Sequence, residues 1–400
     1  MTYDFTTILE RRGMDAIAVD SLGTGWAPDA PKDGFDPIPM WVADMNFPTV
    51  PTIQESISYR VQHPAFGYFN PRPEYFDAII RWQADRNGVR GLTPDCIGYE
   101  NGVLGGVLSA LAAAASPGDP VLVHAPTYIG FTSALERAGY KIIHSPLKLD
   151  EAGIWRMDYA DMDRKLKEHH IHAAIFCSPH NPCGRVWERE ELERAMEIYR
   201  ENACLVISDE IWSDLTLGDA RHIPTQSVSD DARQRTVALY APSKTFNLAG
   251  LVGSYHIIYN ETLRDRVRAI SAKSHYNSMN VLSMYALLGA YTPEGRVWLD
   301  ELRQVLTGNV EFACDFLADH VPGVAVSRPQ GTYMLFLNCE NWCRDHGKTL
   351  DQLLKSGWDV GVAWQDGRPF GGTHTIRMNL ALPRSRVEEA FRRLEKYVFG

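Results

Sequence analysis

Three short apolar runs end at Cys177, near Asp209 and near Ala241, and these ends lie 32 residues apart. That interval fits one strand, one helix and the return to a neighbouring parallel strand. The runs are continuously apolar rather than alternating, as expected of strands covered on both faces. Amphipathic stretches such as Glu188–Ala203 and Thr262–Lys273 fit the covering helices. The middle of the chain is therefore predicted to be an α/β layer with a mostly parallel sheet.

Other parts of the chain have different patterns. The predicted strands of the α/β layer are Pro120–His124, Lys141–His144, Ala173–Cys177, Leu205–Ser208, Val237–Tyr240 and Tyr255–Ile258. In the last third we expect a long helix at Glu294–His320, strands at Thr332–Leu337 and Thr375–Leu380, and helices at Leu350–Ser356 and Arg384–Tyr397. This order is typical of a smaller α+β domain. The first forty residues are rich in Gly, Pro and Asp and are expected to form an arm.

Composition argues against several classes of partner. The 400 residues include 40 Lys and Arg and 50 Asp and Glu, a net charge of −10, whereas nucleic-acid binding needs clustered cations. The longest uncharged stretch, Asn101–Gly118, fits a buried helix with flanking loops better than a membrane span. The N-terminus has no apolar signal core, and the seven irregularly spaced cysteines are typical of reduced thiols. We therefore expect a cytoplasmic protein without nucleic-acid or membrane partners.

Ligands of a parallel α/β sheet bind beyond the carboxyl ends of its strands. Asn181 follows the first apolar run between two prolines, in what could be an ordinary strand–helix loop. Asp209 and Glu210 follow the second run. Lys244 follows the third, beside Pro, Phe and Leu. A desolvated lysine has a lowered pKa and can form an imine, although a lysine in a surface turn would fit the same segment.

Paired carboxylates at a strand end are also found in nucleotide hydrolases, where they hold Mg²⁺. That function requires a phosphate loop of the form G-x-x-x-x-G-K-[ST]. The only Gly-Lys-Thr is 347–349, which follows no predicted strand and has Trp342 in place of the leading glycine. The His-rich run at 168–172 could bind a metal, but it lies in a charged helix end and is expected to be solvated. We expect no metal site.

Two further segments suit anionic ligands. Asn101–Gly106 opens an Ala/Leu-rich helix with three glycines, so that backbone N–H groups can reach a phosphate. The same segment could instead serve helix–helix packing. Arg377 lies in an apolar strand, where its planar donors suit a carboxylate. The alternative is an arginine at a strand edge that pairs with a structural acid.

Taken together, the order of these segments resembles the fold-type-I pyridoxal-5′-phosphate (PLP) enzymes of the aspartate aminotransferase superfamily. The matching order is the Gly-rich helix start, Pro126-Thr127-Tyr128, Asn-Pro-x-Gly at 181–184, Asp209, Lys244 and Arg377. More narrowly, Trp41–Phe47, Phe66-Gly67-Tyr68, Ala241–Gly250 and Pro383-Arg384-Ser385 are similar to the MalY/PatB-type cystathionine β-lyases, which include cystalysin. The resemblance covers nearly the whole chain. It implies a large domain at 46–285, with a mostly parallel seven-stranded sheet between helices, and a smaller α+β domain from 1–45 and 286–400.

The resemblance also implies roles for individual residues at the cofactor. Lys244 would form an imine with PLP and then shuttle protons. Asp209 would pair with the pyridine nitrogen, a role for which an ionised Asp needs little pKa change. The other cofactor contacts would be Asn181 at the ring 3-oxygen, Tyr128 stacked on the ring, and the Val103 and Leu104 amides with the Ser243 hydroxyl at the phosphate.

Substrate and partner contacts follow from the same resemblance. Arg377, aided by the backbone near Ala43, would bind the α-carboxylate of an amino-acid substrate. The protein would be a homodimer with shared active sites, in which Tyr68 reaches the phosphate of the other subunit. Ser274–Met279 is a second candidate for that interface.

Three positions depart from the superfamily pattern. Trp212 stands where a tyrosine often donates to the 3-oxygen, and an indole can only stack or donate through its N–H. Val252 stands where a phosphate-binding arginine is usual, and Ala241 replaces a common serine. The phosphate would therefore depend more on backbone amides, hydroxyls and the neighbouring subunit.

The subfamily resemblance implies a PLP-dependent carbon–sulfur β-lyase. Its substrate would be L-cystathionine or a related cysteine S-conjugate, and its products a thiol, pyruvate and ammonia. An aminotransferase would use the same cofactor residues and remains the alternative. A non-catalytic PLP-binding regulator would need a DNA-binding domain, and no helix-turn-helix pattern or basic cluster precedes the core of the fold.

Overall fold

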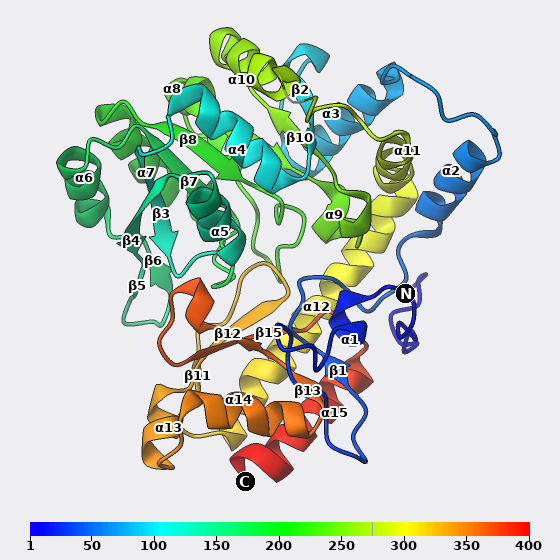
Figure 1. Cartoon of the computed structure of the whole chain (residues 1–400), viewed down its shortest axis with the longest axis vertical. Coiled ribbons are helices and arrows are strands. Elements are labelled where there is room, and N and C mark those ends of the chain that lie inside the picture. Colours follow the sequence, from blue (N-terminus) through cyan, green and yellow to red (C-terminus); the bar gives the residue numbers. More distant parts are fainter. Residues whose placement is uncertain (274) are drawn as a thin grey trace.

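The computed structural model describes residues 1–273 and 275–400 (Figure 1). Within this described chain, seven strands form the large sheet in the order β2-β10-β9-β8-β7-β3-β4. They are β2 (Ile97–Asn101), β3 (Pro120–Ala125), β4 (Lys141–Pro146), β7 (Ala173–Cys177), β8 (Leu205–Asp209), β9 (Thr236–Tyr240) and β10 (Gly253–Ile257). Strands β4, β3, β7, β8 and β9 are parallel, whereas β10 is antiparallel to both of its neighbours. The predicted α/β fold is confirmed.

Helices cover both faces of this sheet because successive strand residues point to opposite sides. On β3, Val121 and Val123 belong to one apolar cluster and Leu122 to another. The first cluster includes side chains of α4 (Val103–Ala114), α5 (Ile129–Arg137) and α10 (Glu261–Lys273). The second includes α6 (Tyr159–Glu168), α7 (Arg189–Glu201) and α8 (Asp230–Arg235).

A third apolar cluster extends from the β10 edge of the sheet into the smaller sheet. It includes α2 (Pro51–Val61), α3 (Pro73–Asn87), α11 (Val281–Ala290) and the long α12 (Pro293–His320). Helices α2 and α11 approach closely at Gly289, where a Cβ would lie 2.5 Å from the Thr52 carbonyl oxygen. The core is therefore continuous from the large sheet along α12 to the small sheet.

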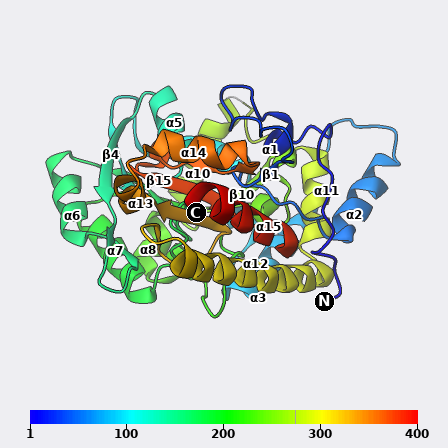
Figure 2. The same cartoon turned by 90° about the horizontal axis from the view of Figure 1, so that it is seen from below.

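The smaller sheet is antiparallel and has the order β11-β12-β15-β14. Its strands are β11 (Ala325–Val326), β12 (Met334–Asn338), β15 (Thr375–Asn379) and β14 (Gln365–Asp366). The helices of this part are α13 (Glu340–Asp345), α14 (Leu350–Asp359) and α15 (Arg384–Leu394). Seen from below, α14 and α15 lie in front of the rest (Figure 2).

The N-terminal arm forms a separate two-stranded sheet with the C-terminal part of the chain, and its Met40 carbonyl accepts from the Asn379 N–H of β15. It contains α1 (Ile17–Asp20) and β1 (Ile38–Pro39), which pairs in parallel with β13 (Val362–Ala363). Remaining short elements are β5 (Lys148–Leu149), β6 (Trp155–Arg156), α9 (Pro242–Thr245), the 3₁₀ turns at Pro94–Cys96, Thr225–Ser227, Ala249–Leu251 and Arg368–Phe370, and a π turn at Glu395–Phe399. The domain boundaries at 45/46 and 285/286 stay a prediction.

The structure adds one strand to the large sheet that the residue patterns did not indicate. Strand β2 contains Gly98 and Glu100 and does not read as an apolar run. Its glycine is required because the His256 ring of β10 lies over it, 2.2 Å from where a Cβ would be. The final helix was expected to reach Tyr397 but ends at Leu394, where the π turn begins.

Two further features concern partners. Among the described residues, no helix is long and apolar enough to cross a membrane. Groups of three or more His, Cys, Asp or Glu that could hold a metal ion are likewise absent from the part of the chain that is described. All seven cysteines are buried and free.

Candidate active site

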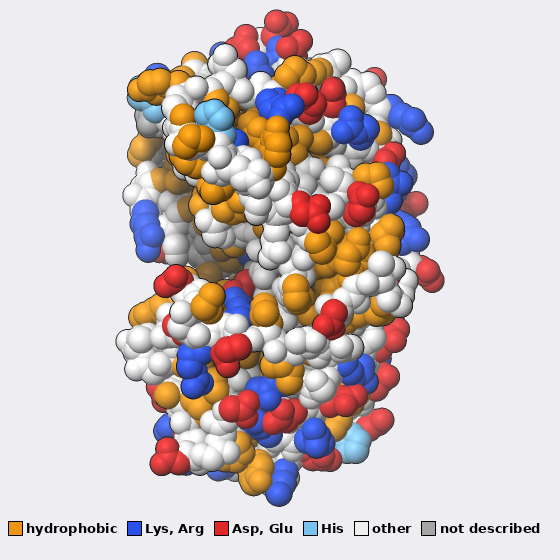
Figure 3. All heavy atoms as spheres, turned by 90° about the vertical axis from the view of Figure 1, so that its right-hand side faces the viewer, with side chains coloured by type: hydrophobic (Ala, Val, Ile, Leu, Met, Phe, Trp, Pro, Cys, Tyr) orange, Lys and Arg blue, Asp and Glu red, His pale blue; other side chains and the backbone are white. Residues whose placement is uncertain are grey.

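A cavity of about 320 Å³ lies at the carboxyl ends of β7, β8 and β9, where ligands of parallel α/β sheets bind. Figure 3 shows the surface hollowed between the upper and lower parts of the molecule. Nine predicted site residues line the cavity: Ala43, Val103, Leu104, Tyr128, Asn181, Asp209, Trp212, Ser243 and Lys244.

Strand register brings the main groups together. In the parallel ladder, Cys177 is opposite Asp209, and Asp209 is opposite Leu239. The loops that leave β7 and β9 therefore start level with Asp209 and carry Asn181 and Lys244 to the same edge. Lys244 lies in α9, a short helix that begins at a proline, whose fixed φ suits a first helical turn.

Asp209 is a buried carboxylate at the base of the cavity, with 4% of its surface exposed. Its Oδ1 accepts a hydrogen bond of 3.0 Å from the Ile211 backbone N–H. Burial raises the pKa of Asp209 to about 7, although that hydrogen bond and Lys244 oppose the shift. In the chain by itself Lys244 offsets only part of this desolvation, so the expectation of little pKa change for Asp209 paired with the pyridine nitrogen stays a prediction. A cationic ring nitrogen opposite Asp209 would restore its ionised form.

Lys244 is half-buried and its amine faces the cavity wall. Nζ donates a hydrogen bond of 2.8 Å to the Ala43 carbonyl oxygen and lies 5.7 Å from the Trp212 ring centroid. Burial, together with the positive charge of Arg377, lowers the pKa of Lys244 to about 8. The neutral, nucleophilic amine is therefore far more populated near neutral pH than it is for a solvated lysine.

Arg377 is not among the residues that line the cavity, but it lies directly behind Asn181. Its Nη1 donates to Asn181 Oδ1 at 3.3 Å, and Nη2 donates to the Trp41 carbonyl at 3.0 Å. Its Nε is buried and has no hydrogen-bond partner in the described chain. Burial lowers the pKa of Arg377 to about 10. A free, buried Nε is consistent with the prediction that Arg377 binds a carboxylate. The hydrogen bonds that Arg377 donates go to a side-chain amide and a backbone carbonyl rather than to a structural acid.

The opposite end of the cavity is formed by the start of α4. Gly102 precedes this helix with φ +86, a conformation that L side chains rarely adopt. The first backbone N–H groups of a helix have no partner within it, so those of Val103 and Leu104 can meet an anion together with the Ser243 hydroxyl. Val252 also lines this end, with φ +63. Among the described lining residues, Lys244 is the sole cation.

Tyr68 is not brought into this cavity. It is fully exposed on the connection between α2 and α3, where it lines a separate hollow of about 780 Å³ with Phe66 and Phe69. Of the predicted interface segment 274–279, Ser274 lies outside the described residues. Within this chain, the Tyr276 hydroxyl donates to the carbonyl of Gly102, the residue before α4, at 3.2 Å.

Sequence reasoning missed several residues around the cavity. Cys177 and Ile211 line it, and each lies next to or near a predicted site residue in the chain. Tyr333 reaches the Ala43 carbonyl, to which its hydroxyl donates at 3.0 Å. No motif pointed to Tyr333, because its partner is a backbone atom 290 residues away.

Comparison with known proteins gives three kinds of match. The family described as aminotransferase class I and II matches residues 41–394. The chain is 34% identical over 388 residues to cystathionine beta-lyase PatB of Bacillus subtilis (strain 168), covering 96% of this chain and 97% of that protein. It is 30% identical over 397 residues to protein MalY of Escherichia coli (strain K12), covering 97% and 96%. The PLP-bound C-S lyase from Staphylococcus hominis is similar in structure, with a TM-score of 0.89, 27% identity and coverage of 100% and 99%.

Proposed function

Because this chain belongs to the class I and II aminotransferase family, we propose that it is a PLP-dependent carbon–sulfur β-lyase. Its substrate is L-cystathionine or a related cysteine S-conjugate, and its products are a thiol, pyruvate and ammonia. The similarity to cystathionine beta-lyase PatB along almost the full length of both chains carries this choice. The cavity residues alone serve an aminotransferase equally well.

The residues around the cavity fit PLP. Asp209 is a buried acid whose ionised form a nearby cation would stabilise. Lys244 has a lowered pKa, so that more of its amine is in the neutral form that reacts with an aldehyde. The start of α4 and Ser243 offer neutral donors to a phosphate at the other end of the cavity. When bound, PLP supplies an aldehyde that reacts with amines and a ring that accepts the electron pair of the substrate Cα.

The chain's own residues bind the substrate and move its protons. Arg377 binds the α-carboxylate through its free Nε and fixes the direction of the Cα–H bond. Lys244 Nζ takes the Cα proton as a general base. With PLP bound, Asp209 would be ionised and would stabilise the positive charge at the ring nitrogen, while Asn181 would donate to the ring oxygen. Tyr128 and Trp212 would cover the ring and keep water out.

The reaction breaks the Cα–H, Cβ–S and Cα–N bonds of the substrate. The Cα–H proton goes to Lys244, and the Cβ–S bond breaks with its electron pair on sulfur. The sulfur takes up a proton and leaves as the thiol. Cβ takes up a proton and becomes the methyl group of pyruvate, water supplies the keto oxygen, and the amino nitrogen leaves as ammonia.

We further propose a cytoplasmic homodimer in which Tyr68 of one subunit completes the phosphate site of the other. Tyr68 is fully exposed, and so are large parts of the apolar side chains of Tyr59 and Val61 at the end of α2 and of Phe66 in the connection that follows it. The phosphate end of the cavity also lacks an arginine or lysine of its own among the described lining residues. Sedimentation should give a dimer at assay concentrations; an active monomer would contradict this proposal.

The function is tested by incubating the purified, PLP-loaded protein with L-cystathionine in the absence of any keto acid. We expect equal amounts of thiol and pyruvate, and no release by the Lys244→Ala variant. Amino transfer that requires an added keto acid and releases no thiol would overturn the lyase in favour of an aminotransferase.

A further inference from the structure

Residues 41–46, which we call the strap, contact both Lys244 and strand β15 of the small sheet, and Ala43 of the strap lines the cavity. Side chains of α9, of β15 and of the loops that carry Asn247 and Tyr333 hold the backbone carbonyls of the strap in place. The Trp41 carbonyl accepts from Arg377 and the Ala43 carbonyl accepts from Lys244. The strap therefore contacts both the residue that receives the carboxylate and the residue that moves the proton.

Asn379, on strand β15 of the small sheet, binds the backbone carbonyls on both sides of Ala43. Its Nδ2 donates to the Val42 carbonyl at 2.7 Å and to the Asp44 carbonyl at 2.5 Å, and its Oδ1 accepts from the Ala381 N–H at 2.7 Å. The side chain is buried, and both of its N–H donors are used. The carbonyls on either side of Ala43 are thus fixed to one amide group.

Asn247 fixes the strap to the loop of the lysine. It lies three residues after Lys244 and forms two hydrogen bonds with the Met45 backbone, accepting at 3.0 Å and donating at 2.9 Å. Its φ of +57 lies in the left-handed region, which asparagine tolerates better than most residues. The distance from the strap to the lysine loop is therefore set by a two-point contact.

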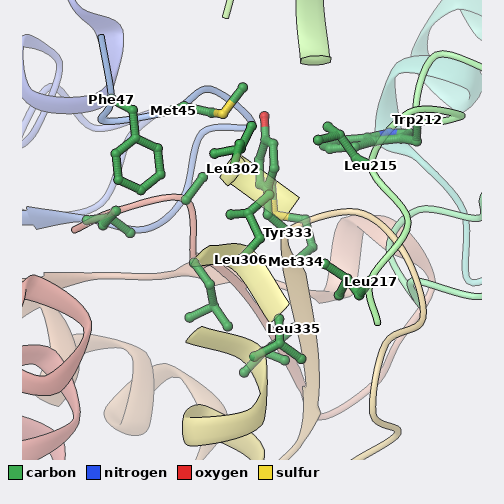
Figure 4. Close-up of a cluster of buried hydrophobic side chains, with 14 of the residues drawn as sticks. Met45, Phe47, Trp212, Leu215, Leu217, Leu302, Leu306, Tyr333, Met334 and Leu335 are labelled. Carbon is green, nitrogen blue, oxygen red and sulfur yellow. The ribbon is translucent and has the colours of Figure 1, made fainter. Parts of the chain in front are cut away.

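Tyr333 donates a hydrogen bond to the same oxygen as Lys244, the carbonyl oxygen of Ala43. Its hydroxyl donates to the Ala43 carbonyl at 3.0 Å, and its ring packs edge-on against Trp212 with centroids 4.8 Å apart. Figure 4 shows Tyr333 between Met45 and Trp212, with its hydroxyl pointing away from the cluster that contains Met334 and Leu306. A carbonyl oxygen has two lone pairs, so one is taken by Tyr333 and the other by Lys244.

We propose that the Lys244 amine donates a hydrogen bond to the Ala43 carbonyl oxygen whenever it is not covalently bonded to the cofactor. Tyr333 and Asn379 are then positioning residues that fix the place of this oxygen. When the amine donates one N–H to a fixed oxygen, its nitrogen lone pair points in a defined direction. Proton transfer from Cα requires such an orientation, because the lone pair accepts the proton. The inference rests on the proposed function only in that Lys244 exchanges protons with Cα, as it would in either a lyase or an aminotransferase.

Tyr333→Phe isolates this role because it removes one hydroxyl and no charge. The charged groups that act on Lys244 are Arg377 on β15, Asp44 on the strap and Asp209 on β8, and all three stay in place. Tyr199→Phe is the matched control. Tyr199 is also fully buried, and its hydroxyl is 3.5 Å from His124 in the cluster behind the sheet, far along the chain from the strap.

The first test uses the protein without PLP. The Lys244 amine is labelled with an acylating reagent at a series of pH values, and the extent is read by mass spectrometry. With Tyr333 gone, the oxygen accepts from Lys244 alone and favours its charged form, so the labelling midpoint should move up by about half a pH unit. A midpoint equal to that of wild type and Tyr199→Phe would overturn the inference.

The second test uses the PLP-loaded enzyme. We expect Tyr333→Phe to lower kcat by up to about tenfold, to change KM by less than about twofold, and to raise the isotope effect of α-deuterated substrate on kcat. Asn379→Asp, which turns two donors into acceptors against carbonyls, should lower kcat further. An unchanged isotope effect in Tyr333→Phe would also overturn the inference, whether or not Asn379→Asp folds. If wild type itself releases no thiol and pyruvate, the lyase proposal fails, while the labelling test still decides this one.

Discussion

The two sides of the cavity act on the same lysine by different means. On the large-sheet side, Asp209 and Lys244 are fixed by the register of parallel strands and meet at a strand edge. On the small-sheet side, Arg377, Asn379 and Tyr333 act on backbone oxygens of the strap. The first side supplies the acid and the amine, whereas the second supplies the guanidinium of Arg377 and the groups that orient the strap.

This difference explains why the two sides titrate differently. Asp209 and Lys244 are ionisable groups whose pKa values are shifted toward their neutral forms, because burial penalises charge. On the small-sheet side Asn379 and the strap carbonyls do not titrate, and burial lowers the pKa of Arg377 only to about 10, so it stays charged near neutral pH. Substitutions on the large-sheet side should therefore change chemistry and pH dependence, and most of those on the small-sheet side should change geometry.

The largest effect is expected from Lys244→Ala. Loss of the amine removes the group that binds the cofactor aldehyde and moves the Cα proton, so pyruvate release should fall by at least about 10³-fold. The yellow absorbance of the bound cofactor should also be lost. Lys165→Ala is the control, since Lys165 is similarly sheltered, at 17% side-chain exposure, but lies on α6. Equal loss in both variants would contradict a specific role of Lys244.

The next effect concerns stability without PLP. Burial raises the pKa of Asp209 from 3.8 to about 7, so the folded chain binds more protons than the unfolded chain between those values. As pH rises from about 4 to 7, wild type should lose up to about 4 kcal/mol of unfolding free energy relative to Asp209→Asn. Urea unfolding of both proteins across this range measures the difference. If the unfolding free energies of the two proteins change with pH in the same way, Asp209 is not desolvated in the folded chain.

On the small-sheet side, Arg377→Lys should lower kcat/KM by about 100-fold. A lysine keeps the charge but cannot offer the planar pair of donors that a carboxylate accepts, so most of the change should be in KM. Steady-state kinetics with L-cystathionine measure this. A change confined to kcat, with KM unaltered, would place the carboxylate elsewhere.

The smallest effect is expected from Tyr68→Phe. The side chain is fully exposed in one chain, so the unfolding of the monomeric unit should not change. If it completes the partner's phosphate site, the dissociation constant of PLP should rise by about tenfold or less, the value of one hydrogen bond to an anion. Equilibrium dialysis measures it, with Tyr59→Phe, 68% exposed, as the control. If Tyr68→Phe and Tyr59→Phe have the same dissociation constant for PLP, Tyr68 does not contact the phosphate site of the other subunit.

The sequence allowed the large-sheet side to be predicted almost residue by residue. Six strands and the residues after them follow from local apolar runs, and Asp209 and Lys244 line the cavity as expected. Edge strand β2 was not predicted, because a strand with Gly98 and Glu100 depends on its partner for its conformation.

The strap contacts could not be predicted in the same way. The Ala43 carbonyl is a backbone atom, and every residue has one, so no side-chain pattern marks it. Asn379 lay within reach, because residues two apart on a strand share a face and Arg377 was already singled out. Tyr333 and the raised pKa of Asp209 depend on burial by distant segments, which local sequence does not reveal.

The central claim is that the Lys244 amine binds PLP in this cavity. Reduction of the PLP-loaded protein with borohydride, followed by digestion and mass spectrometry, tests it directly. The account predicts the added mass of the reduced cofactor on Lys244 and on no other lysine. The same mass on a different lysine, or a Lys244 peptide that stays unmodified while the cofactor is bound, would contradict it.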